Sequence, residues 1–79
     1  MNTKMHTNPD GTQVLIMIGE NSQIHPTTVI GVNCVIGNNC TISEGCEIGS
    51  NTIIGNHSVL AKNAVLKSGR RTAAYAHLE

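Results

Sequence analysis

The fold is decided by residues 30–60, which read IGVNCVIGNNCTISEGCEIGSNTIIGNHSVL. An aliphatic residue returns at every sixth position, and the same rhythm extends in both directions to fill residues 18–66. These aliphatic residues are Ile18, Ile24, Ile30, Ile36, Ile42, Ile48, Ile54, Leu60 and Leu66. A small residue lies four positions after each of the first eight aliphatic residues: Ser22, Thr28, Cys34, Cys40, Cys46, Thr52, Ser58 and Ala64. Because two positions of six are fixed in size over this length, the stretch is a structural repeat.

Each hexad, numbered from its aliphatic residue, is expected to contain a short strand and a sharp corner. Side chains alternate across an extended backbone, so positions five and one point inward and position six points outward. Position four is Asn or Gly in seven of nine units, and these residues adopt the left-handed region most cheaply. A strand that turns a corner every six residues must pair with a later strand running the same way. The pattern therefore predicts a parallel β-solenoid.

The motif (Ile or Leu)-Gly-x-Asn-(small)-x resembles the hexapeptide repeat of the bacterial transferases. The resemblance covers residues 18–66, which is 49 of the 79 residues. It implies an all-β, left-handed parallel β-helix of about 2.7 coils with three hexapeptides per coil; the hand comes from the resemblance, because parallel crossovers generally favour the opposite one.

This interpretation divides the chain into three parts. Residues 1–17 are a loose lead-in and cap strand, with a turn predicted at Asn8-Pro9-Asp10-Gly11. Residues 18–66 are the β-helix. Residues 67–79 form a C-terminal tail, in which Thr72 is placed to cap a short helix that ends near Leu78.

With three hexads per coil, residues 18 apart stack on one another. The cysteines, spaced by six, then lie on three different walls as small inward residues, and their spacing matches no zinc motif. Among the outward residues, only the wall of Met17, Val35 and Ile53 is apolar at every level. We predict that another subunit covers this wall, although β-branched residues also suit exposed strands. The resemblance implies that the assembly is a homotrimer.

Composition limits the possible partners. Five basic and five acidic residues give a net charge of zero, so neither nucleic acid nor an anionic membrane surface is expected as a partner. No apolar run approaches the roughly 18 residues that span a bilayer, and the N-terminal residues lack a signal-peptide core. We expect a cytoplasmic protein that binds no metal.

His57 is the candidate catalytic residue. The segment Ile54-Gly55-Asn56-His57-Ser58-Val59-Leu60 is similar to one in galactoside and maltose O-acetyltransferases, which implies that His57 is a general base acting with acetyl-coenzyme A as acyl donor. Imidazole suits this role because its unperturbed pKa is about 6.5. The acceptor would be a small molecule carrying a hydroxyl or an amine. However, position four also favours His for its tolerance of positive φ.

The alternative function is a non-catalytic assembly or scaffolding module. The chain lacks the further coils, the long loop and the acceptor-binding domain of the enzymes that it resembles. The other histidines are weaker candidates: His25, within the phrase IHPTT, is interpreted as a corner residue at the start of the helix, and His6 and His77 lie in the poorly specified ends.

Overall fold

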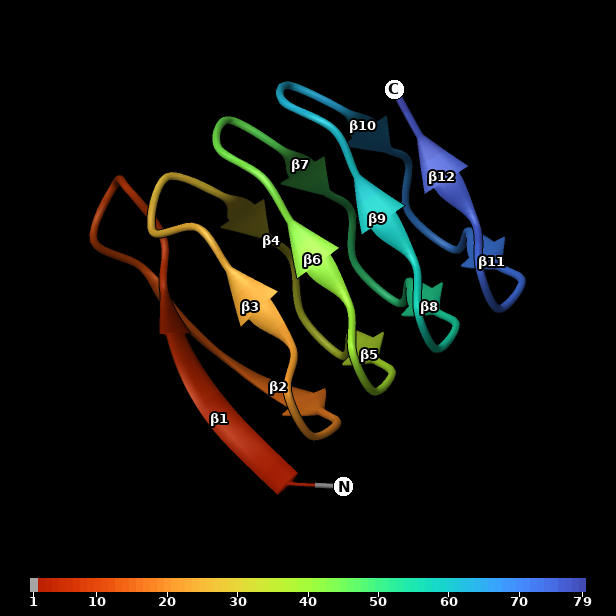
Figure 1. Cartoon of the computed structure of the whole chain (residues 1–79). Helices are drawn as coiled ribbons and strands as arrows, with labels where there is room; N and C mark the ends of the chain where they lie inside the picture. The colour runs from red at the N-terminus through yellow and green to blue at the C-terminus, as the bar shows by residue number, and fades with distance from the viewer. Residues whose placement is uncertain (1) are drawn as a thin grey trace.

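A computed structural model describes residues 2–79, and every regular element in them is a β-strand (Figure 1). The first two strands, β1 (Asn2–Thr7) and β2 (Gln13–Ile18), have six residues each. The remaining strands have two residues each: β3 (Gln23–Ile24), β4 (Val29–Ile30), β5 (Val35–Ile36), β6 (Thr41–Ile42), β7 (Glu47–Ile48), β8 (Ile53–Ile54), β9 (Val59–Leu60), β10 (Val65–Leu66), β11 (Arg71–Thr72) and β12 (His77–Leu78). The described residues contain no helix that is long and apolar enough to cross a membrane.

The strands form three parallel walls, as the repeat predicts. Wall A has the order β2-β5-β8-β11, wall B the order β3-β6-β9-β12, and wall C the order β4-β7-β10. Paired residues are 18 apart on every wall, as in Met17 opposite Val35 and Ile24 opposite Ile42. In Figure 1 the arrows of wall B lie side by side, from orange β3 to blue β12. The chain is an all-β parallel β-helix of about three turns, and its repeats fit the left hand.

The aliphatic residues of position one fill the centre of the helix. Ile36 and Leu60 are fully buried, and only Ile24, on the first strand of wall B, is partly exposed. The strand register confirms three inward ladders: Ile18-Ile36-Ile54, Ile24-Ile42-Leu60 and Ile30-Ile48-Leu66. Burial of each large aliphatic side chain stabilises the fold by about 1.5–3 kcal/mol.

The small residues of position five connect one coil to the next. The Ser22 hydroxyl donates to the carbonyl oxygen of Gly37 at 2.6 Å, 15 residues further along the chain. The three thiols make the same contact, each at 3.1 Å from the carbonyl oxygen 15 residues later: Cys34 to Gly49, Cys40 to Gly55 and Cys46 to Ala61. The cysteines are therefore inward residues on three walls, as predicted, and they replace hydroxyl side chains in a regular pattern.

The corners depend on backbone conformations that position four supplies. Asn33, Asn51 and Gly69 have φ values of 59°, 60° and 77°, within the left-handed region. Thr27 is the exception, since its φ is not positive. At position two, a Cβ on Gly37 would lie 2.8 Å from the backbone nitrogen of Asn56 in the following coil, so the spacing of the coils requires glycine there.

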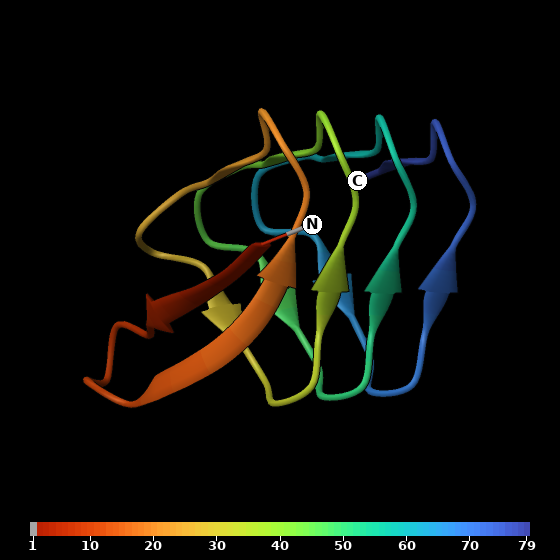
Figure 2. The same cartoon turned by 90° about the horizontal axis from the view of Figure 1, so that it is seen from below.

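The loose lead-in expected before the helix is instead a β-hairpin. Residues 2–7 form β1, which pairs antiparallel with β2 and places Met5 opposite Leu15. The predicted turn at residues 8–11 joins the two strands: the N–H of Gly11 donates to Asn8 O at 2.9 Å, and Gly11 has a φ of 92°. Figure 2 shows the hairpin at the first-coil end, with its tip extending away from the coils. Met1 lies outside the described residues.

The predicted C-terminal helix is wrong. Residues 67–79 continue the β-helix, with β11 paired to β8 on wall A and β12 paired to β9 on wall B. Thr72 takes the inward position opposite Ile54, and Tyr75 takes the corner with a φ of 63°. An isolated helix of this length is only marginally stable, whereas both strands find a neighbour. The predicted boundary at residue 66 therefore moves to residue 78.

Candidate functional site

His57 lies at the corner between β8 and β9. Its φ is 61°, and its backbone N–H donates to Asn38 O at 2.8 Å. Its ring stacks on the ring of Tyr75, with centroids 4.7 Å apart and planes inclined by 6°. Both residues are exposed. No side chain of residues 2–79 hydrogen-bonds to either ring nitrogen of His57, so the stack fixes the ring plane while leaving the imidazole edge accessible.

His57 lines none of three grooves on the surface of residues 2–79. One follows wall B and the corner after it, where Gln23, His25 and Thr41 contribute to the lining. Another lies between the hairpin and wall C. The third lies beside Met17 and Val35 on wall A. A single chain therefore does not enclose the candidate base.

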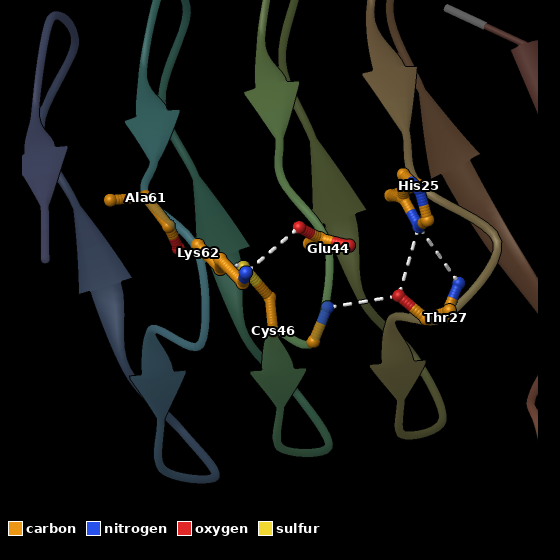
Figure 3. A network of polar contacts seen from close by, with 7 residues as sticks. His25, Thr27, Glu44, Cys46, Ala61 and Lys62 are labelled. Carbon is orange, nitrogen blue, oxygen red and sulfur yellow. Dashed lines mark hydrogen bonds and ion pairs between the residues drawn. The ribbon is translucent and has the colours of Figure 1, made fainter.

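The corner after wall B holds a polar network that connects successive coils (Figure 3). Thr27 is its centre: Thr27 Oγ1 accepts from the N–H of Gly45 at 2.9 Å and lies 2.9 Å from Nδ1 of His25. Since the N–H of Thr27 also points at this Nδ1 atom, at 3.2 Å, Nδ1 accepts and the proton of the neutral ring is on Nε2. At the same corner of the next two coils, Glu44 and Lys62 form an exposed ion pair of 3.2 Å, which contributes little to stability. His25 is thus placed as a corner residue.

The outward face of wall A carries the expected apolar ladder of Met17, Val35 and Ile53, but the wall is not apolar at every level, because the exposed Arg71 of β11 lies opposite Ile53. Met17 is 44% exposed and Ile53 39%, while Val35 between them is partly buried. The hairpin lengthens this face, because Met5 and Leu15 also remain exposed on it. The structure confirms that these residues share one face, and it places His57 only four residues after Ile53, at the corner where wall A ends.

In a comparison with protein families, the chain matches the model described as bacterial transferase hexapeptide (six repeats). The match covers residues 16–50 and 27–62, and so more than half of the chain. The chain belongs to this hexapeptide-repeat family. Comparisons with curated proteins and with solved structures gave no significant match. The family assignment accounts for the repeat and the fold, and it leaves the substrate open.

The cysteines of this hexapeptide-repeat protein are free and buried. Loss of hydration on burial raises the pKa of the Cys34 and Cys46 thiols above the usual value of 9.0. The uncharged thiol is therefore favoured, and the thiolate, which is the reactive form, is disfavoured. Among residues 2–79, no group of three His, Cys, Asp or Glu residues has the arrangement of a metal site.

The sequence missed the importance of His6 and Asn8. Both side chains are buried, and both hydrogen-bond to the backbone of wall C. His77, by contrast, is exposed on β12. The only sequence feature that pointed to the N-terminal contact was the turn motif at residues 8–11, because a tight turn after a polar segment predicts a hairpin that folds back on its neighbour.

Proposed function

We propose that this hexapeptide-repeat protein transfers an acetyl group from acetyl-coenzyme A to a small hydroxyl or amine acceptor, and that it acts as an assembly of its own copies, most simply a homotrimer. One observation carries the proposal. The accessible imidazole edge of His57 lies at the corner that follows directly after Ile53, beside the apolar ladder of wall A. A second copy covering that ladder would bring a further surface next to His57 and supply the cleft that one chain lacks.

The chemistry asked of His57 is general-base catalysis. A neutral imidazole removes the proton from the acceptor hydroxyl or amine as the acceptor atom forms a bond to the thioester carbonyl carbon. The carbon–sulfur bond breaks, and the sulfur leaves as a thiolate. The imidazolium then returns its proton to that thiolate, so His57 ends neutral and no electrons are exchanged. Stacking on Tyr75 would restrict the rotation of the ring and so help to orient its edge.

The same proposal includes the cytoplasm as the site of action. Three free thiols sit inside the coils, each bonded to a carbonyl oxygen. Unpaired cysteines in this number suit a reducing compartment.

A specific observation favours the second candidate function, a non-catalytic assembly module. His57 belongs to a corner column in which Asn21, Asn39 and Tyr75 take the same left-handed conformation. In this alternative, its positive φ and its stack on Tyr75 would account for His57 at this corner without any catalytic role. The apolar ladder would then serve self-association alone.

The decisive experiment compares turnover of acetyl-coenzyme A by the wild type and by His57→Asn. Asn is the matched replacement because it occupies the same corner one coil earlier, at Asn39, with a φ of 57°. The proposal expects acetyl transfer by the wild type, a loss of about 10²- to 10⁴-fold in His57→Asn, and unchanged activity in the control His25→Asn. Absence of both coenzyme binding and turnover in the folded wild type would reject catalysis and leave the assembly module.

A further inference from the structure

On each wall, the N–H groups of alternate residues donate to carbonyl oxygens of the following coil. On wall C, Cys46 O and Ile48 O accept from the N–H groups of Val29 and Gly31 at 2.9 and 2.8 Å. The residues 18 earlier than these acceptors are Thr28 and Ile30. The first strand of wall C therefore presents two carbonyl oxygens to the N-terminal end, where no further wall C strand lies among residues 2–79.

Two side chains of the hairpin take the place of that missing strand. His6 Nε2 lies 2.7 Å from Thr28 O, and because a carbonyl oxygen only accepts, Nε2 carries the proton. The Asn8 amide donates through Nδ2 to Ile30 O at 3.0 Å and accepts through Oδ1 from the Ile30 N–H at 2.8 Å. Both side chains are at most 7% exposed. The edge of β4 is thus satisfied by an imidazole and an amide in place of a backbone.

On wall A the same hairpin closes the edge by reversing the strand direction. β1 pairs along the whole length of β2 and runs antiparallel to it. All other pairings in the β-helix are parallel. A coil that arrived at this end in the direction of the solenoid would meet an antiparallel edge on wall A and an occupied edge on wall C.

Within the described residues, the hairpin forms no strand pair with wall B, and the unpaired backbone groups at the two ends of this wall are complementary. Cys40 O and Ile42 O accept hydrogen bonds from N–H groups of the coil before them. Ser22 O and Ile24 O occupy the equivalent positions 18 residues earlier. No donor of residues 2–79 reaches the two earlier oxygens. At the other end, the N–H groups of Val59 and Ala61 donate to carbonyl oxygens of the last coil. The N–H groups of residues 77 and 79 occupy the equivalent positions 18 residues later. The free donors of β12 therefore have the spacing that the free acceptors of β3 require.

Charge also favours contact between opposite ends. The last coil carries three cationic residues and one anionic residue, Lys67, Arg70, Arg71 and Glu79. The hairpin and the first corner carry two anionic residues and one cationic residue, Asp10, Glu20 and Lys4. Opposite net charges attract two copies in a head-to-tail order and disfavour contact between like ends.

We propose that the N-terminal hairpin prevents head-to-tail stacking of this protein with a second copy of the chain. When His6 and Asn8 no longer bond to β4, the N-terminal end accepts the last coil of a second copy, and β12 of that copy adds to β3 as a parallel strand. Because this contact closes no symmetric ring, it builds an open filament. The inference does not depend on acetyl transfer or on the apolar ladder of wall A.

The test compares the full-length wild type with His6→Ala/Asn8→Ala by sedimentation velocity over a range of concentrations. The wild type is expected to keep one mass, while the double variant grows several-fold in mass as concentration rises. Adding His77→Pro removes one free donor of β12 at a position where proline blocks an edge, and it should return the mass to that of the wild type. A double variant that keeps the wild-type mass, or assembly that His77→Pro does not reduce, would overturn the proposal.

A cross-linking experiment covers the case in which the double variant does not fold. In Asn8→Ala, the substitutions Gln23→Cys and His77→Cys are placed on separate chains, which are then mixed under mild oxidation. Head-to-tail stacking places these positions opposite each other, as Gln23 lies opposite Thr41 within the chain, at a Cα distance that a disulfide spans. The matched control replaces His77→Cys by Val65→Cys on wall C. A heterodimer from the first mixture alone supports the proposal, and equal yields from both mixtures contradict it.

Discussion

The alternation of inward and outward residues predicts opposite effects for two neighbouring substitutions on β5. Ile36 is fully buried and lies between Ile18 and Ile54 in its ladder. Ile36→Ala removes three carbons, worth roughly 2.4 kcal/mol at about 0.8 kcal/mol each. The cavity adds to this loss, because the coils above and below are held by their backbone ladders and collapse only partly. We expect a total near 3–4 kcal/mol, within the measured range of about 2–5 kcal/mol for such changes.

The matched control is Val35→Ala, one residue away on the outward face. Its side chain is partly exposed, so within a single chain its truncation is expected to cost less than about 1 kcal/mol. Urea unfolding followed by circular dichroism measures both free energies of unfolding, with both substitutions made in the Ile53→Lys background, which is expected to be monomeric, because self-association adds to apparent stability. Equal losses in the two variants, or a larger loss for Val35→Ala, would refute the assignment of these residues to opposite faces.

The remaining predictions concern a corner, the thiols and the ion pair. Gly37→Ala should lower the free energy of unfolding by about 1–3 kcal/mol, because its Cβ would clash with Asn56 of the next coil; an unchanged urea midpoint would contradict this. Above pH 9.0 the unfolded chain releases the thiol protons that folded Cys34 and Cys46 retain, so stability should be complete below that pH and fall as pH rises through it. Urea midpoints measured from pH 7 to 10 check this, and replacing both cysteines by Ser should flatten the decline. Lys62→Met breaks an exposed ion pair and should change stability by less than about 1 kcal/mol, whereas a larger loss in the same assay would show that the pair is structurally important.

The sequence determined the fold because one regular period controls packing, strand pairing and corners together. The spacing of Ile18, Ile36 and Ile54 was enough to assign the ladder that the strand register confirms. The prediction failed where a position of the repeat holds a residue type that differs from the other hexads. Thr72 fills an aliphatic position and Tyr75 a corner, so the sequence of the last coil hides the repeat and favours a helix.

The contacts of the N-terminal hairpin were beyond sequence reasoning for a different reason. His6 and Asn8 bond to backbone groups 22 residues away, and such contacts have no period and no local motif. The surroundings of His57 were also only partly predictable from the sequence. The sequence placed His57 at a corner, but the stack on Tyr75 follows only from the continuation of the coil that was missed.

The most direct test of the account is the mass of the wild-type protein and of Ile53→Lys in solution. The chain has a mass of 8.4 kDa, and a homotrimer formed through Met17, Val35 and Ile53 has three times that mass. Sedimentation equilibrium should give the trimer for the wild type. Ile53→Lys should shift the protein to the monomer, because a charge on the covered ladder loses hydration without gaining a partner. The control Thr41→Lys, on wall B, should keep the wild-type mass. A monomeric wild type, or a trimer that persists in Ile53→Lys, would contradict the account.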